Sequence, residues 1–348
     1  FPLAAQRNGI TPLWASEISP PAISITKRHF PQMAHLGSIT ELHGGNIPSV
    51  DILTFGSPCQ DLSLAGTRSG IEGEQSSLFF EAIRIIEEMR CATNGIYPAI
   101  TIWENVVGAF SSNDRMDFAA VLGAFTHYQI PVPDSGRWAT AGMVRGYTPD
   151  LAWRTLGAQH FGIPQKRRRI FLVCDYRAQR AAQILFEPER LYKVFPAGAA
   201  GGLAAAPGAG NGPAAAGWPP SEIYALQGRK LRGAAVTKDK SQFYGGFGHP
   251  NDAVPTLLTS DLQVIFAHFP SSPQDDFVRY LTPTEYELLM GLPLGWTETG
   301  HDGRRISETA RYFALGNSIA VPCADYLMFK MSLSIRNPPI LANKNPPV

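Results

Sequence analysis

A cysteine follows an apolar stretch near residue 55, in a position where it could do chemistry. The run "VDILTF" (50–55) leads into "GSPCQDLS" (56–63), which places Cys59 directly after a proline. A lone cysteine can be a packing residue, a metal ligand, half of a disulfide or a nucleophile. Reactive residues of α/β proteins gather at the carboxyl ends of buried strands. The position of Cys59 therefore favours a nucleophile.

Two further apolar stretches border groups that could assist such a nucleophile. The stretch 97–103 is followed directly by Glu104, and the stretch 168–175 begins at the block that contains Arg167 and Arg169. Nearby arginines can lower the pKa of a thiol, and a carboxyl group in a closed, partly apolar site can retain a proton. Together these groups are suited to covalent catalysis. Arg168 alternates with the other two arginines, and we interpret it as a surface residue.

The cysteine spacing excludes a structural zinc site and a disulfide scaffold. The chain has four cysteines, none in a Cys-x-x-Cys pair and none with histidines at zinc-finger spacing. We expect no metal ion and a reducing, cytoplasmic compartment. Packing roles are predicted for the other three cysteines, which are Cys91, Cys174 and Cys323.

Length, composition and charge indicate a soluble enzyme with one large and one smaller domain. The chain has 348 residues, of which 44% are hydrophobic and 17% charged. No apolar run approaches the roughly 20 residues that span a bilayer. A net charge of +1 gives no argument for nucleic acid, but Lys166–Arg169 forms a local basic block. The first residues lack the basic start and apolar block of a signal peptide. The chain begins with Phe1 rather than Met, which suggests a fragment or a trimmed chain.

Strand-like and helix-like stretches alternate over the first half of the chain. Helical spacing of apolar residues occurs in 77–90 and 117–125, between the strand-like runs 50–55, 97–103 and 168–175. This order predicts an α/β fold whose sheet is mostly parallel, with helices on both faces.

The pattern changes after about residue 185. Residues 195–222 are rich in Ala, Gly and Pro, which predicts a loop or linker, and 223–270 read as a small irregular β region. A helix is expected within 281–293. Thr282, Pro283 and Glu285 supply its start signals, and Gly291 its end. A last helix is expected near 323–333, followed by a loose tail.

Five blocks together resemble the signature motifs of the DNA cytosine-C5 methyltransferases, in that family's order. They are "GSPCQDLS" (56–63), "ENV" (104–106), "FGIPQKRRRIFLV" (161–173), "LTPTEYELLMGLP" (281–293) and "ALGNSIAVP" (314–322). The resemblance implies a Rossmann-like, S-adenosylmethionine-dependent methyltransferase sheet with a smaller, irregular β-rich target recognition domain. The implied parts are a catalytic and cofactor-binding domain (1–180), a variable target recognition region (181–275, including the loop 195–222), a return to the catalytic domain (276–335) and a loose tail (336–348).

The resemblance also implies catalytic roles. The Cys59 thiolate would add to C6 of a cytosine swung out of the duplex, and Glu104 would supply a proton or hydrogen bond at N3. Arg167 and Arg169 would hold cytosine O2 and the catalytic loop. The residues implied to contact DNA are Gln60, Ser63, Arg68 and Gln165.

The implied methyl donor is S-adenosylmethionine. Glu17 would bind its ribose hydroxyls, Ile18 would pack on its adenine, and Ser38 and Ile39 would flank the edge of the base. The rest of the implied pocket consists of Phe1, Pro58, Leu78, Asn317 and Ser318. The sequence departs from the family pattern in two places: Ser38 stands where an aspartate is usual, and the Phe-x-Gly-x-Gly-Gly loop does not precede Phe1.

Three functions follow as hypotheses. The leading one is a bacterial or phage-type methyltransferase that acts on double-stranded DNA. We expect a monomer without a membrane partner. A cognate restriction endonuclease is a further partner where the system has one. The second keeps the chemistry but takes RNA as substrate. The third is a catalytically inactive DNA-binding remnant, against which the retention of Cys59, Glu104 and Arg169 argues.

Overall fold

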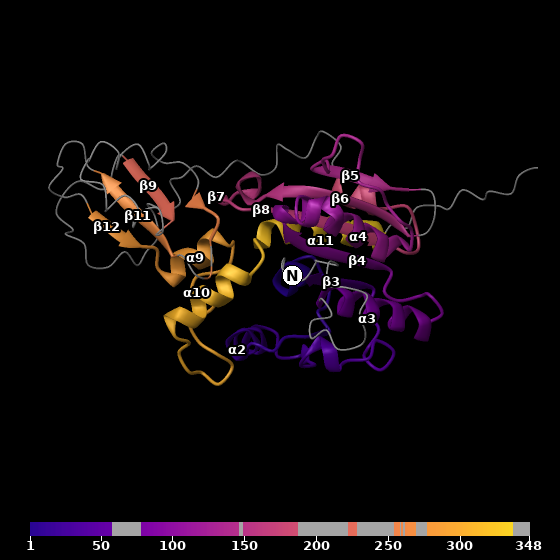
Figure 1. Ribbon diagram of the computed structural model, residues 1–348. Coiled ribbons are helices and arrows are strands. Elements are labelled where there is room, and N and C mark those ends of the chain that lie inside the picture. Colours follow the sequence, from indigo (N-terminus) through magenta and orange to yellow (C-terminus); the bar gives the residue numbers. More distant parts are fainter. Residues whose placement is uncertain are drawn as a thin grey trace, which may run out of the picture.

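The described strands and helices form two groups, a larger one around a central sheet and a smaller one beside it (Figure 1). The computed structural model describes residues 1–57, 78–145, 149–186, 222–227, 254–257, 259, 262–268 and 277–336. Among them, no helix is long and apolar enough to span a membrane.

The larger group contains most of the described elements. Its helices are α1 (Pro2–Arg7), α2 (Pro20–His29), α3 (Leu78–Ala92), α4 (Met116–Thr126), α5 (Ala181–Leu185) and α11 (Val321–Arg336). Its strands are β1 (Trp14–Ala15), β2 (Ala34–His35), β3 (Ile52–Gly56), β4 (Ile100–Val106), β5 (Ala141–Val144), β6 (Asp150–Gly157) and β8 (Arg168–Asp175). The mixed α/β fold class predicted from the sequence is confirmed.

The direction of the strands differs from the prediction. The central sheet has the order β3-β4-β8-β6-β5, and of its four pairings only β3–β4 is parallel. The prediction of a mostly parallel sheet is therefore wrong for the described strands. The reason is that β5 and β6, which the sequence pattern did not reveal, pair in antiparallel fashion, and the short connection from β6 to β8 reverses the chain.

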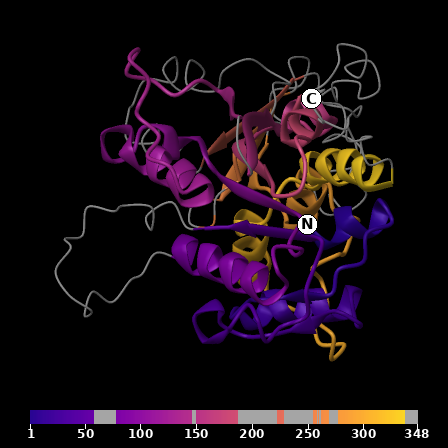
Figure 2. The ribbon, with the colours of Figure 1, turned by 90° about the vertical axis from the view of Figure 1, so that its right-hand side faces the viewer.

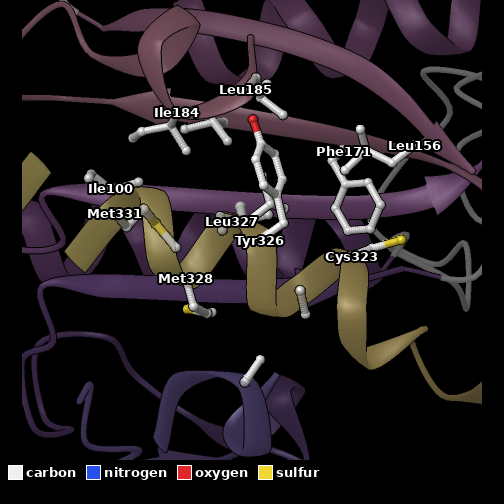
Figure 3. Close-up of a cluster of buried hydrophobic side chains, with 14 of the residues drawn as sticks. Ile100, Leu156, Phe171, Ile184, Leu185, Cys323, Tyr326, Leu327, Met328 and Met331 are labelled. Carbon is white, nitrogen blue, oxygen red and sulfur yellow. The ribbon is translucent and has the colours of Figure 1, made fainter. Parts of the chain in front are cut away.

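Strand alternation gives the central sheet a hydrophobic core on each face. On β8, Phe171 and Val173 contact one cluster, to which α1, α5 and α11 contribute. Ile170, Leu172 and Cys174 contact the other, which α3 and α4 cover. In Figure 2, β3 and β4 run between α3 and α11. Figure 3 shows side chains of α11 directed at the strands on the first face.

The smaller group, here called the small unit, is built on its own core. It comprises β9 (Glu222–Gln227), β10 (Val254–Pro255), β11 (Gln263–His268), β12 (Phe277–Tyr280), α9 (Pro283–Leu289) and α10 (Glu308–Asn317). Strands β12, β11 and β9 form an antiparallel sheet. Short β7 (Gln165–Lys166) pairs with β10 and lies between the two groups (Figure 1).

The chain returns to the large group later than the proposed boundary at residue 276. Leu281, Tyr286 and Leu315 pack with Leu257 in the hydrophobic cluster of the small unit. The cluster of the central sheet takes up the chain again from Ala320. In this structure the return to the large group therefore starts near residue 320. The predicted linker 195–222 lies outside the described residues except for Glu222, and the tail outside them except for Arg336.

The predicted signals of helix α9 are all used. The Thr282 hydroxyl accepts from the Glu285 amide, and the Glu285 carboxylate accepts from the Thr282 amide at 2.7 Å, which closes a capping box. Beyond the helix, Gly291 has φ +75°, and a Cβ placed there would lie 2.4 Å from Cδ of Pro322. The start of α11 thus packs directly on the backbone that ends α9.

We expect Gly291→Ala to destabilise the protein more than Gly303→Ala. Both glycines have positive φ, so alanine adds strain of about 1–2 kcal/mol at either position. At Gly291 the added methyl group also meets Pro322, which costs about 1–3 kcal/mol more, whereas nothing lies within 4 Å at Gly303. Thermal unfolding of both variants measures the difference. Equal losses would show that α11 does not pack tightly on this turn.

Candidate functional site

Glu104 lies at the edge of the central sheet where β3 ends. It is inside β4 rather than after it, and it pairs in register with Gly56 of β3. A Cβ at Gly56 would lie 3.2 Å from Glu104 Oε2, so the lack of a side chain makes room for the carboxyl group. Cys59 follows Gly56 by three positions in the chain and is itself outside the described residues.

Arg169 reaches the same edge because β8 is antiparallel to β4. Val106 pairs in register with Arg169, so the beginning of β8 meets the end of β4. Arg169 Nε lies 3.2 Å from Glu104 Oε1, and each side chain is 16% exposed. The structure thus brings together two of the predicted catalytic residues in a largely buried ion pair.

The environment of Glu104 raises the pKa of its carboxyl group. Burial raises the pKa of this carboxyl group above its usual value, while Arg169 and, less strongly, Arg167 act to lower it. The net effect is a raised pKa. A carboxyl group in this state can hold a proton closer to neutral pH than an exposed glutamate can.

Arg167 is placed differently from its predicted role. Its side chain is buried, and it donates to the carbonyl oxygens of Leu257 (3.3 Å), Gly316 (3.3 Å) and Ser318 (2.6 Å). Burial, and then Arg169, lower the pKa of the Arg167 guanidinium to about 10. In this arrangement Arg167 holds backbone segments together, and the role predicted for it jointly with Arg169, holding cytosine O2 and the catalytic loop, stays a prediction.

Gln165 also differs from its predicted role. The side chain is fully buried, and Nε2 donates to the carbonyl oxygen of Leu289 at 2.5 Å. Its Oε1 accepts from the Leu257 amide at 3.4 Å. A side chain enclosed in this way has no surface to offer to DNA, so the predicted DNA contact does not agree with the structure.

Trp103 and Asn105, for which no role was predicted, hold Ser57, the residue directly after β3. Trp103 Nε1 donates to Ser57 Oγ at 3.1 Å, and Asn105 Nδ2 donates to the Ser57 carbonyl at 3.1 Å. Ser57 is two positions before Cys59. The "ENV" block contained the signal for Asn105, but its partner could not be read from the sequence.

The predicted cofactor residues on β1 and β2 are brought side by side. The two strands pair in parallel, and Ser16 Oγ donates to the Gly37 carbonyl at 2.8 Å, which joins the turns that follow them. One turn carries Glu17 and the other Ser38.

Within these turns the side chains have distinct environments. Glu17 Oε1 accepts from the amides of Ile18 and Ser19, both at 2.8 Å, while the Ile18 side chain is 72% exposed. Ser38 caps a 3-10 turn (Ile39–Glu41), and Ile39 is partly buried against the α3–α4 core. The Glu17 carboxylate is thus fixed beside an exposed apolar side chain.

The remaining predicted residues in the described ranges lie on different elements. Phe1 packs against the core beneath α11, and Leu78 begins α3 with 40% exposure. Asn317 ends α10, and Ser318 follows it in the turn that Arg167 binds. The other predicted site residues lie outside the described ranges: Pro58, Cys59, Gln60, Ser63 and Arg68.

The raised pKa of Glu104 makes a testable contribution to stability. A carboxyl group whose pKa is higher in the folded state than the usual 4.5 favours folding below that value and loses this contribution as pH rises. Relative to Glu104→Gln, which cannot ionise, the wild type should therefore become less stable from acid to neutral pH. Melting temperatures of both proteins across that range measure the difference. A difference that changes in the opposite direction would show that Arg169 outweighs burial.

Curated relatives match this chain over different lengths. A "DNA N-6-adenine-methyltransferase" of Escherichia phage P1 is 33% identical over 211 residues, which is 52% of this chain and 28% of that protein. The type II methyltransferase M.NgoBV of Neisseria gonorrhoeae is 33% identical over 48% of this chain and 35% of its own length. The chain thus spans about a third of the length of these two relatives. The type II methyltransferase M2.BsuMI of Bacillus subtilis is 26% identical over 93% of this chain and 70% of its own length.

Solved structures support the fold. A putative DNA modification methyltransferase encoded within an E. coli prophage gives a TM-score of 0.58 at 16% identity and covers 96% of both chains. Dnmt2 methyltransferase of S. pombe gives 0.56 at 16% identity and covers 96% of this chain and 95% of its own. The C-5 cytosine-specific DNA methylase family matches residues 1–193, more than half of the chain, and the chain therefore belongs to this family.

Proposed function

We propose that this protein transfers a methyl group from S-adenosylmethionine to C5 of a cytosine that has been swung out of a specific duplex DNA sequence. The observation that carries the proposal is the buried Glu104–Arg169 ion pair at the end of β3, directly before the segment with Cys59. Membership of the family supports the class of reaction, and type II methyltransferases among the relatives support DNA as the substrate.

In the proposed mechanism, the chain's own groups activate the cytosine ring. The Cys59 thiolate adds to C6, which makes C5 enamine-like and able to take a methyl group. Charge pushed into the ring is stabilised by a proton or hydrogen bond from Glu104 at N3, for which a raised pKa is suited. Arg169 holds the Glu104 carboxyl group in place and lies where it could also bind O2 of the base.

The turns after β1 and β2 fit the proposed cofactor. Among the described residues no hydrogen bond to Glu17 Oε2 is present, so this oxygen can accept from a ribose hydroxyl. The exposed Ile18 side chain offers an apolar surface for adenine. When bound, S-adenosylmethionine supplies the methyl group. Ser38 has a hydroxyl at the position of the usual aspartate, and it is engaged with Thr40 Oγ1 at 2.7 Å.

The small unit is proposed to read the target sequence. It has a hydrophobic cluster of its own, distinct from the clusters of the central sheet. It lies beside the edge of the sheet that carries Glu104 (Figure 1). A cognate restriction endonuclease is proposed as a partner by analogy with the type II relatives.

Expression of the chain, extended to its natural start, should place methyl groups on cytosine within one short motif of plasmid DNA. Base-resolution methylation sequencing measures this directly and also defines the motif. An unmethylated plasmid together with 5-methylcytosine in cellular RNA would favour the RNA hypothesis. Intact protein that methylates neither nucleic acid would support an inactive remnant.

A duplex with 5-fluorocytosine at the target position should form a denaturation-resistant complex with the wild type. Fluorine cannot leave C5 as a proton does, so the sulfur–C6 bond persists after methyl transfer. Cys59→Ala should form no such complex, although its DNA affinity should stay within a few-fold of wild type. Cys91→Ala is the matched control, because Cys91 is an exposed free cysteine on α3. Adduct formation by Cys59→Ala would refute the nucleophile assignment.

A further inference from the structure

The segment around β7 joins the small unit to the central sheet. Strand β7 pairs with β10 in parallel, and the Val254 amide donates to the Pro164 carbonyl at 2.7 Å. Thr256 Oγ1 donates to the Lys166 carbonyl at 2.8 Å. From Arg168 the same chain continues as β8, the central strand that carries Arg169 to Glu104.

Two side chains of this segment hold both backbone groups of one residue in the small unit. The Leu257 amide donates to Gln165 Oε1 at 3.4 Å, and its carbonyl accepts from Arg167 at 3.3 Å. Leu257 is fully buried in the hydrophobic cluster of the small unit. Buried backbone groups need such partners, so the two side chains fix where that cluster begins.

Gln165 makes a second connection, to the helix with the capping box. Its Nε2 donates to the carbonyl of Leu289, the last residue of α9. Leu289 contributes to the same cluster as Leu257. One buried amide therefore links β7 to two separate segments of the small unit.

We propose that Gln165 is a positioning residue, which sets the small unit against the catalytic edge of the sheet without touching DNA. The inference rests on the proposed function, in which the small unit reads the target sequence. The contacts of Gln165 with Leu257 and Leu289 are here called the joint. Gln165 precedes Arg169, the partner of Glu104, by four positions, so a change in the joint shifts bound DNA relative to Glu104. The turns carrying Glu17 and Ser38 follow other strands, so we expect the contacts that they make with the cofactor not to depend on Gln165.

The variant Gln165→Leu keeps a similar volume and removes the hydrogen bonds of the side chain to Leu289 and Leu257, together with the one to Met290 Sδ at 3.5 Å. We expect KM for the cognate duplex to rise about tenfold, as loss of these hydrogen bonds implies, with kcat within about twofold. Affinity for S-adenosylhomocysteine, measured calorimetrically without DNA, should be unchanged. Gln165→Glu keeps the acceptor for Leu257 but sets a buried carboxylate oxygen against the Leu289 carbonyl, so it should lose at least as much as Gln165→Leu. Arg168→Ala, an exposed position in the same segment, is the control and should match the wild type.

Two results would overturn the proposal. If Gln165→Leu relaxes the methylated motif at a single base pair, Gln165 contacts DNA directly. If it weakens cofactor binding as strongly as DNA binding, its role is general stability. A raised KM with an unchanged motif and unchanged cofactor affinity supports a positioning role.

Hydrogen exchange tests the joint without any activity. In Gln165→Leu, amide exchange should become faster in 254–257 and at the end of α9, while β4 and β8 keep their protection. Unchanged exchange would show that the amide does not hold the small unit. A wild type that never methylates DNA would refute the proposed function, and the exchange result would still decide whether Gln165 forms the joint.

Discussion

The buried guanidinium of Arg167 is the contact on which the arrangement of the site depends. It binds the carbonyl oxygens of Leu257, Gly316 and Ser318, which lie 90, 149 and 151 positions from Arg167 in the sequence. A buried charge is tolerated only where hydrogen bonds replace its lost water. The three carbonyls supply part of that replacement, and in doing so they bring the small unit and the turn after α10 to the start of β8.

The same burial has a second consequence, at Glu104. A site closed enough to enclose Arg167 also excludes water from the neighbouring carboxyl group, whose pKa is raised in spite of two nearby arginines. The Arg167 guanidinium donates its hydrogen bonds to backbone carbonyls. Among the described residues, Arg169 is the arginine that forms the ion pair with Glu104. The carboxyl group is thus held in position while burial raises its pKa, which suits a proton donor.

Local signals in the sequence predicted some parts of the fold well. The bounds of β8 match the predicted strand 168–175, because an unbroken apolar run marks a central strand buried on both faces. The capping box of α9 was readable because all of its partners lie within four residues. That Glu104 and Arg169 meet at one edge was expected only from the order of the signature blocks, because the start of β8 meets the end of β4 only when the two strands are antiparallel.

Features that depend on distant partners could not be predicted. The antiparallel direction of β8 follows from its pairing with β6, whose residues 150–157 include polar positions and did not stand out as a strand. The burial of Gln165 depends on Leu257 and Leu289, about ninety or more positions away. Nothing in the local sequence distinguishes a glutamine that faces DNA from one that holds two backbone segments.

Side chains of an extended chain alternate between two faces, and this alternation explains how residues 165–169 hold the small unit, the turn after α10 and Glu104 together. Gln165 and Arg167 are buried and Arg169 is largely so, whereas Lys166 and Arg168 between them are exposed. Residues two apart share a face, so one side of the chain carries Gln165, Arg167 and Arg169 in order. Gln165 holds the small unit, Arg167 holds the turn after α10, and Arg169 pairs with Glu104. A shift of one residue would turn all three outward. The Gln-x-Arg-x-Arg spacing is therefore a geometric requirement of this edge of the sheet.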